Sequence, residues 1–187
     1  MPAIAKQQAI AQGTWNVDPV HSSVEFQVKH MGIATVKGFF AEFAGKLEIG
    51  DTLDQSVASG TVEVASVNTR EAARDEHLKG ADFFDAANHP QLTFVSRGIA
   101  AAAGASGGLT IDGDLTVHGV TKPVRLEAVV DGPDTDPWGN ERIGVEAVTT
   151  ISRADYEMKF NQALGSGNML VSDKVNIVLQ ISAVKAA

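Results

Sequence analysis

The stretch Ser23-Val24-Glu25-Phe26-Gln27-Val28-Lys29 alternates apolar and polar side chains with a period of two residues. Successive side chains of a β-strand point to opposite faces, so Val24, Phe26 and Val28 share one face of this segment. The polar residues between them share the other face. The pattern therefore predicts a strand with one buried side and one solvent-facing side.

The same alternation recurs in both halves of the chain and indicates that strands dominate the fold. Short segments with glycine or turn-forming residues separate the strands, which favours antiparallel pairing because parallel neighbours need crossovers of about a dozen residues. We therefore predict an all-β sandwich or barrel of eight or nine strands. Besides the opening stretch, the predicted strands are residues 35–43, 44–49, 57–65, 91–100, 109–118, 124–128, 143–151 and 175–182.

One region departs from the strand pattern. Residues 68–85 contain EAARDEHLK, and Asn68 followed by Glu71 resembles a capping box, so we expect one helix there. The alanine- and glycine-rich residues 99–108 are predicted to form a mobile loop between two strands.

Length and composition limit the class of protein. A chain of 187 residues fits one domain, and we assign residues 13–187 to it and residues 1–12 to an N-terminal tail. The formal net charge of −8 argues against nucleic acid and anionic membrane surfaces as partners. The absence of cysteine excludes disulfides, thiolate metal sites and cysteine nucleophiles.

Three segments together resemble the YceI-like family. They are VDPVHSSVEFQVKHMGIATVKGFF (residues 17–40), RDEHLKGADFFDAANHPQLTFVS (residues 74–96) and GDLTVHGVTKPVRLEA (residues 113–128). The resemblance implies an antiparallel, lipocalin-like barrel of eight strands with a short helical cap, often dimeric, that carries a polyisoprenoid or another long-chain amphiphile in its pore.

The N-terminus differs from family members that carry a secretory signal. Residues 1–12 lack a basic segment followed by a continuous apolar core, because Lys6, Gln7 and Gln8 interrupt it. No apolar run reaches the length of a transmembrane helix. We therefore expect a soluble cytoplasmic protein without a transmembrane segment.

In an eight-stranded barrel, alternate residues of each strand line an interior that can hold one slender ligand. The sequence does not decide which face of each strand points inward, so the candidates are equally open to ordinary core packing. We expect Phe83 and Phe84 to close one end, and His30 and His118 to contact a headgroup or, alternatively, to make structural hydrogen bonds. The other candidate lining residues are Phe26, Val28, Phe39, Phe43, Phe94, Met158, Phe160 and Met169.

The sequence gives little indication of metal ligation or anion binding. No two of His21, His30, His77, His89 and His118 show metal-ligand spacing, so we expect no metal and no cofactor other than bound lipid. Lys29, Lys37, Lys122 and Arg125 could together attract a pyrophosphate, or they could be ordinary exposed residues.

The G-x-S-x-G pattern at residues 104–108 lies between two predicted strands and lacks the strand-to-helix context of a hydrolase nucleophile. We therefore expect a non-enzymatic protein whose partners are a long-chain lipid and a second copy of the chain. Two alternatives stay open. One is a lipid-modifying enzyme that uses histidine as acid or base, and the other is a protein-interaction module with an apolar outer face around Trp138.

Overall fold

The computed structural model describes residues 11–103 and 108–187. Strands dominate these ranges, and the one α-helix described is short, which confirms the predicted all-β class. The strands are β1 (Gly13–Val17), β2 (Ser23–His30), β3 (Ala34–Phe40), β4 (Phe43–Ile49), β5 (Val57–Glu63), β6 (Val67–Asn68), β7 (Gln91–Ala101), β8 (Gly108–Val117), β9 (Val120–Thr135), β10 (Glu141–Ser152) and β11 (Val171–Lys185). The helices are α1 (Ala72–Lys79) and the 3₁₀ turns η1 (Pro19–His21), η2 (Leu53–Gln55), η3 (Val64–Ser66) and η4 (Arg153–Tyr156).

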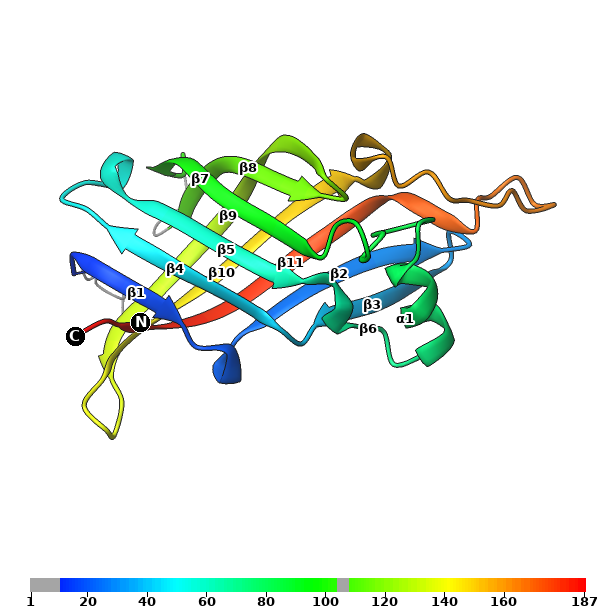
Figure 1. The fold of residues 1–187 in the computed structure, drawn as a ribbon. Helices are drawn as coiled ribbons and strands as arrows, with labels where there is room; N and C mark the ends of the chain where they lie inside the picture. The colour runs from blue at the N-terminus through cyan, green and yellow to red at the C-terminus, as the bar shows by residue number, and fades with distance from the viewer. Residues whose placement is uncertain (1–10, 104–107) are drawn as a thin grey trace, which may run out of the picture.

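Eight strands close into an antiparallel barrel, as predicted (Figure 1). Their order is β1-β4-β5-β7-β8-β9-β10-β11, and the pairing of Trp15 with Lys185 joins the first strand to the last. Closure leaves no free edge along this circuit, so the strands form a continuous wall around an interior.

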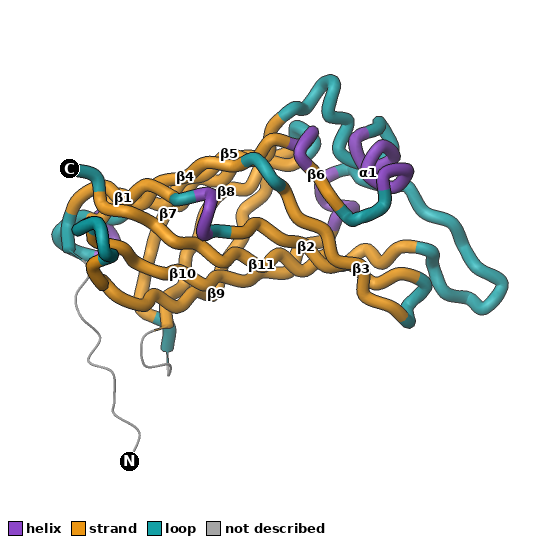
Figure 2. Tube along the Cα trace, turned by 90° about the horizontal axis from the view of Figure 1, so that it is seen from below, coloured by secondary structure: helices purple, strands orange, loops and turns teal. Residues whose placement is uncertain are grey.

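The sheet forks at η1. The C-terminal end of β11 pairs with β1, whereas the rest of β11 pairs with β2, from Gln180 opposite Ser23 to Val171 opposite His30. The strands β3 and β6 extend the sheet beyond β2. Figure 2 shows β1 and the C-terminus at one end of the molecule, and α1, β3 and β6 toward the other.

The core follows the length of the barrel. Trp15 is fully buried at the end of the barrel where the C-terminus lies, and it packs there with Ile143 and Ala183. A second cluster around Ile111 and Ala147 fills the middle, and a third contains Val117, Tyr156 and Met158. Among the helices of the described residues, none combines the length and the hydropathy needed to span a membrane.

The helix begins later than the sequence suggested, and the capping-box prediction was wrong. Asn68 lies in β6, and its side chain accepts a hydrogen bond from the Arg70 backbone N–H at 2.9 Å. Glu71 is the N-cap residue of α1 and accepts from the Ala73 N–H. Pairing of β6 with β3 holds Asn68 in an extended conformation, which is why it cannot start the helix.

Two strand boundaries also differ from the prediction. Residues 35–43 are not one strand, because β3 ends at Phe40 and β4 begins at Phe43. The predicted loop at 99–108 is shorter than expected, since β7 continues through Ala101 and Ile99 is buried opposite Ile111. Residues 104–107, like residues 1–10 of the predicted tail, lie outside the described residues.

Candidate functional site

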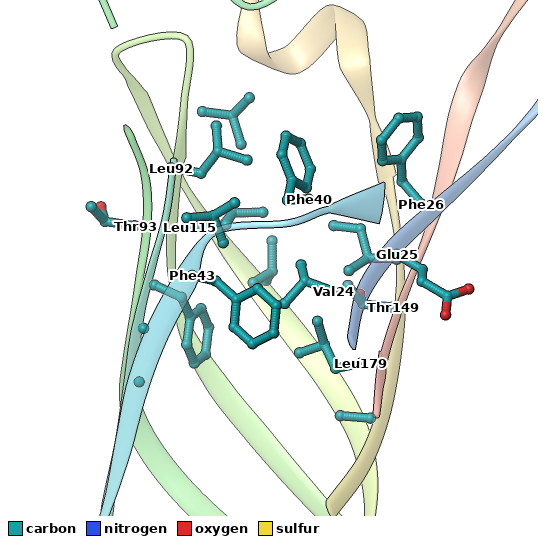
Figure 3. Close-up of a pocket in the computed structure, with 18 of the residues that line it drawn as sticks. Val24, Glu25, Phe26, Phe40, Phe43, Leu92, Thr93, Leu115, Thr149 and Leu179 are labelled. Carbon is teal, nitrogen blue, oxygen red and sulfur yellow. The ribbon is translucent and has the colours of Figure 1, made fainter. Parts of the chain in front are cut away.

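The barrel contains an apolar cavity of about 270 Å³ that is partly open to the outside. Mostly alternate residues of β2, β8, β10 and β11 line it, which identifies the inward-facing side of these strands that the sequence left open. In Figure 3, Val24, Phe43 and Leu179 gather around one space, whereas the polar ends of Glu25 and Thr93 point away from it. The inward-facing side chains include Val24, Phe26 and Val28 of β2, Leu92 and Phe94 of β7, Ile111, Leu115 and Val117 of β8, Val145, Ala147, Thr149 and Ile151 of β10, and Val175, Ile177, Leu179 and Ile181 of β11.

Two phenylalanine rings lie against the barrel wall because the residues that they cover are glycines, which have no side chain. A Cβ atom at Gly38 would lie 2.2 Å from Cζ of Phe26, and one at Gly113 would lie 2.5 Å from the Phe94 ring. Phe26 in turn contacts Phe40, with ring centroids 5.6 Å apart, and Phe40 meets Phe84 edge to face at 5.7 Å. These rings connect the wall to the segment that follows α1.

Seven of the twelve predicted ligand-binding residues lie around this cavity. They come from β2, β4, β7, the turn after α1 and the turn after η4, so the fold brings distant parts of the sequence together. Their contact with a ligand is part of the proposal below. The seven are Phe26, Val28, Phe43, Phe83, Phe84, Phe94 and Met158.

The other five lie outside the set that lines the cavity. Phe39 neighbours the inward-facing Phe40 on β3 and therefore occupies the opposite face. Phe160 packs against Phe83 and His77, with centroid distances of 5.2 and 4.9 Å. Met169 is 46% exposed. The remaining two, His30 and His118, are at the end of β2 and directly after β8.

Sequence reasoning missed Arg153, a buried cation beside the cavity. This residue is 5% exposed and donates to the backbone oxygens of Met158 at 2.7 Å, Ser172 at 3.0 Å and Val171 at 3.4 Å. Desolvation lowers the pKa of Arg153, although a guanidinium stays charged at neutral pH. Within the described residues it forms no salt bridge, and the nearby charge of Asp173 opposes its desolvation without direct ion-pair contact. No sequence signal distinguishes it from a surface arginine.

Phe40 was also missed, because the pair Phe39-Phe40 interrupts the alternation that identifies the inward face. The inward-facing residues of β11 were recognised as a strand pattern, but not as cavity lining.

One residue of the predicted anion-binding cluster and two of the histidines have carboxylate partners. Arg125 forms a fork with Asp112, with N···O distances of 2.7 and 2.8 Å, which neutralises it as an anion-binding group. This bond holds the pKa of Asp112 below its ordinary value. His21 pairs with Asp18, and His77 with Asp82.

The closed antiparallel wall and the apolar interior place the protein in the lipocalin-like class of β-barrels. The model of the YceI-like domain matches residues 15–183. The chain belongs to this family, in agreement with the resemblance seen in the sequence.

Known proteins support the assignment over most of the chain. Protein YceI of Escherichia coli is 36% identical over 170 residues, which cover 88% of this chain and 82% of that protein. The crystal structure of Burkholderia cenocepacia BcnA matches with a TM-score of 0.77 and 25% identity, covering 89% of this chain and 98% of BcnA. A polyisoprenoid-binding domain from Saccharophagus degradans matches with a TM-score of 0.68 and 17% identity, covering 92% and 98% of the two chains, and shares the fold.

Proposed function

We propose that the protein binds the hydrocarbon chain of an amphiphile, isoprenoid or fatty-acyl, inside the barrel and carries or stores it without changing it chemically. The observation that carries this proposal is the barrel cavity, whose lining is almost entirely aliphatic and aromatic. Each methylene moved from water into such a site contributes about 0.8 kcal/mol before ordering and association costs. A cofactor is not needed for this function.

The cavity volume limits how a long chain can fit. At about 270 Å³, the cavity lies just below the range of about 300–1,000 Å³ typical of pockets for drug-sized ligands. A long chain therefore requires side-chain movement, and we expect the contacting rings of Phe26, Phe40 and Phe84 to shift. The polyisoprenoid-binding domain of S. degradans, which has the same fold, is consistent with a chain-like ligand.

Arg153 favours an amphiphile with an anionic headgroup. A carboxylate or phosphate near this guanidinium would provide the direct ion pair that Asp173, which acts on Arg153 only at longer range, does not form. The shared chemistry is an anionic oxygen group attached to an apolar chain.

Native mass spectrometry of the purified protein, followed by organic extraction, tests the proposal. We expect a stoichiometric lipid in the wild type and in Val95→Asp, because Val95 is 52% exposed on the outer face. Phe94→Asp should lose it, because Phe94 lines the cavity. A folded Phe94→Asp protein with full lipid content would contradict the proposal.

A second measurement does not depend on a variant that folds. The wild type, stripped of lipid, should bind a fluorescent fatty acid that prenyl phosphate displaces. A stripped, folded protein that binds neither compound would overturn the proposal. Intact ligand recovered after long incubation would argue against a lipid-modifying enzyme.

One observation favours a second candidate, a protein-interaction module. Trp138 is 81% exposed in the turn between β9 and β10. Asp136 fixes this turn by accepting from the backbone N–H groups of Trp138 at 3.0 Å and Asn140 at 2.9 Å. If a homodimer forms through this residue, light scattering should show a dimer for the wild type and a monomer for Trp138→Lys.

A further inference from the structure

Three side chains from two separate segments meet at the end of the third core cluster. Asp85 and His89 belong to the turns between α1 and β7, and His118 follows β8. One potential ligand atom from each lies within 4.8 Å of the others, and all three residues are partly buried. The undescribed residues 1–10 and 104–107 contain no His, Cys, Asp or Glu side chain that could add to this group.

The hydrogen bonds of these side chains leave metal-ligand atoms with free lone pairs for a cation. His118 Nδ1 lies 3.1 Å from the backbone oxygen of Tyr156, which can only accept, so Nδ1 carries the proton and Nε2 keeps its lone pair. A histidine that ligates a metal commonly donates its other ring N–H in this way. Asp85 Oδ2 accepts from Asn88 Nδ2 at 2.8 Å, which leaves Oδ1. Within the described residues, the His89 ring has no hydrogen-bond partner.

Two of the three residues have left-handed backbone, and at His118 this follows from the two-residue turn between the paired Val117 and Val120. Asp85 and His118 have φ angles of +47° and +51°, in the left-handed region that residues other than glycine seldom adopt. The His89 and His118 rings meet edge to face with centroids 5.1 Å apart. Gly119 makes room for this contact, since a Cβ there would lie 2.5 Å from Cε1 of His89.

We propose that Asp85, His89 and His118 form a binding site for a divalent transition metal, with Zn²⁺ as the best fit. Two imidazole nitrogens and one carboxylate oxygen suit Zn²⁺ better than Ca²⁺ or Mg²⁺, which prefer oxygen ligands. Bonds of about 2.0–2.1 Å in a tetrahedral site place ligand atoms ~3.4 Å apart. The side chains must therefore close by up to about 1.4 Å when the metal binds, and one coordination position remains for water or another ligand.

The site would connect the turn after α1 to the β8–β9 hairpin. Phe84 and Val117, which both line the cavity, directly precede Asp85 and His118. A bound metal would therefore join two wall segments of the cavity at residues 85–89 and 118. Metal binding does not depend on the lipid proposal, because it uses side chains outside the lining.

Calorimetric titration of the tag-free, chelator-treated wild-type protein with Zn²⁺ tests the site. We expect one Zn²⁺ per chain. Loss of a supporting hydrogen-bond partner typically costs about 10–100-fold in metal affinity, so loss of a ligand should cost at least ~100-fold. The variants are Asp85→Asn and His118→Asn, since asparagine tolerates a positive φ, and His89→Asn.

The control is His77→Asn. His77 also lies near a carboxylate, with Nε2 2.9 Å from Asp82 Oδ2, but it belongs to no three-residue cluster of the described chain. It should keep wild-type Zn²⁺ affinity, and circular dichroism without metal should show that all variants are folded. Failure of the wild type to bind Zn²⁺, or unchanged binding by the folded His89→Asn and His118→Asn proteins, would overturn the proposal.

Discussion

At the scale of single residues, glycines determine where the aromatic rings of the cavity lie. Gly38 on β3 is opposite Phe26 on β2, and the ring occupies the space that a side chain at position 38 would fill. This packing keeps Phe26 against the wall and the cavity open. A larger residue would force the ring inward.

Gly38→Ala should therefore reduce stability and lipid content together. We expect a loss of roughly 1–3 kcal/mol, the usual range for overpacking, measured by chemical denaturation. Gly144→Ala is the matched control, because Gly144 also lies in a strand and nothing lies within 4 Å of its Cβ position. Equal stability and equal lipid content in the two variants would show that the Phe26 ring is free to move.

Arg153 permits a test of headgroup preference. Arg153→Met leaves backbone oxygens of Met158 and Ser172 without their donor, and each such loss costs about 1–3 kcal/mol. It should also abolish any preference for a fatty acid over its methyl ester, whereas Arg153→Lys keeps the positive charge. The two affinities are compared by displacement of a fluorescent probe. If folded Arg153→Met still prefers the fatty acid over its methyl ester, this guanidinium does not recognise the headgroup.

At the scale of elements, one arginine connects three of them at the fork of the sheet. Arg142 at the start of β10 donates to Asp18, the N-cap residue of η1, at 2.7 Å. It also donates to Asp136 at the start of the β9–β10 turn at 2.8 Å. The hydrogen bond from Arg142 is the main cause that lowers the pKa of Asp18 to about 2, and it also holds the pKa of Asp136 below its ordinary range.

This network predicts a specific acid sensitivity. Because the folded-state pKa of both carboxyl groups lies below the unfolded value of 3.8, their contribution is present above about pH 4 and is lost as the pH falls toward 2. Arg142→Gln should lower the Tm at pH 7, and its difference from the wild type should shrink toward pH 2. Arg125→Gln, which breaks a more exposed pair with Asp112, should change the Tm little. A constant Tm difference for Arg142→Gln from pH 7 to 2 would contradict this account.

At the scale of the whole molecule, local pattern predicts the strands but not what the closed barrel brings together. The alternation at Val24, Phe26 and Val28 identified β2 correctly, because the side-chain period of a strand is a local property. The direction of each face depends on closure, so Phe39 and Phe40 could not be distinguished. The meeting of Asp85 and His89 with His118 depends on the packing of separate elements, and their sequence spacing gives no sign of it.

Ligand binding should stabilise the entire barrel, because the cavity is lined by strands from around its circumference. A ligand present at 100 times its Kd adds about 2.7 kcal/mol to the free energy of unfolding. In a protein of this size, each kcal/mol raises the Tm by about 2–4 °C, so removal of lipid should lower the Tm by ~5–10 °C. Calorimetry should show that added lipid restores the Tm of the stripped wild type. The stripped Val95→Asp protein should recover in the same way, whereas Phe94→Asp should have a Tm that lipid does not change. An equal Tm for lipid-bound and stripped wild type would mean that the lipid has no higher affinity for the folded barrel than for the unfolded chain, which excludes the cavity as its specific site.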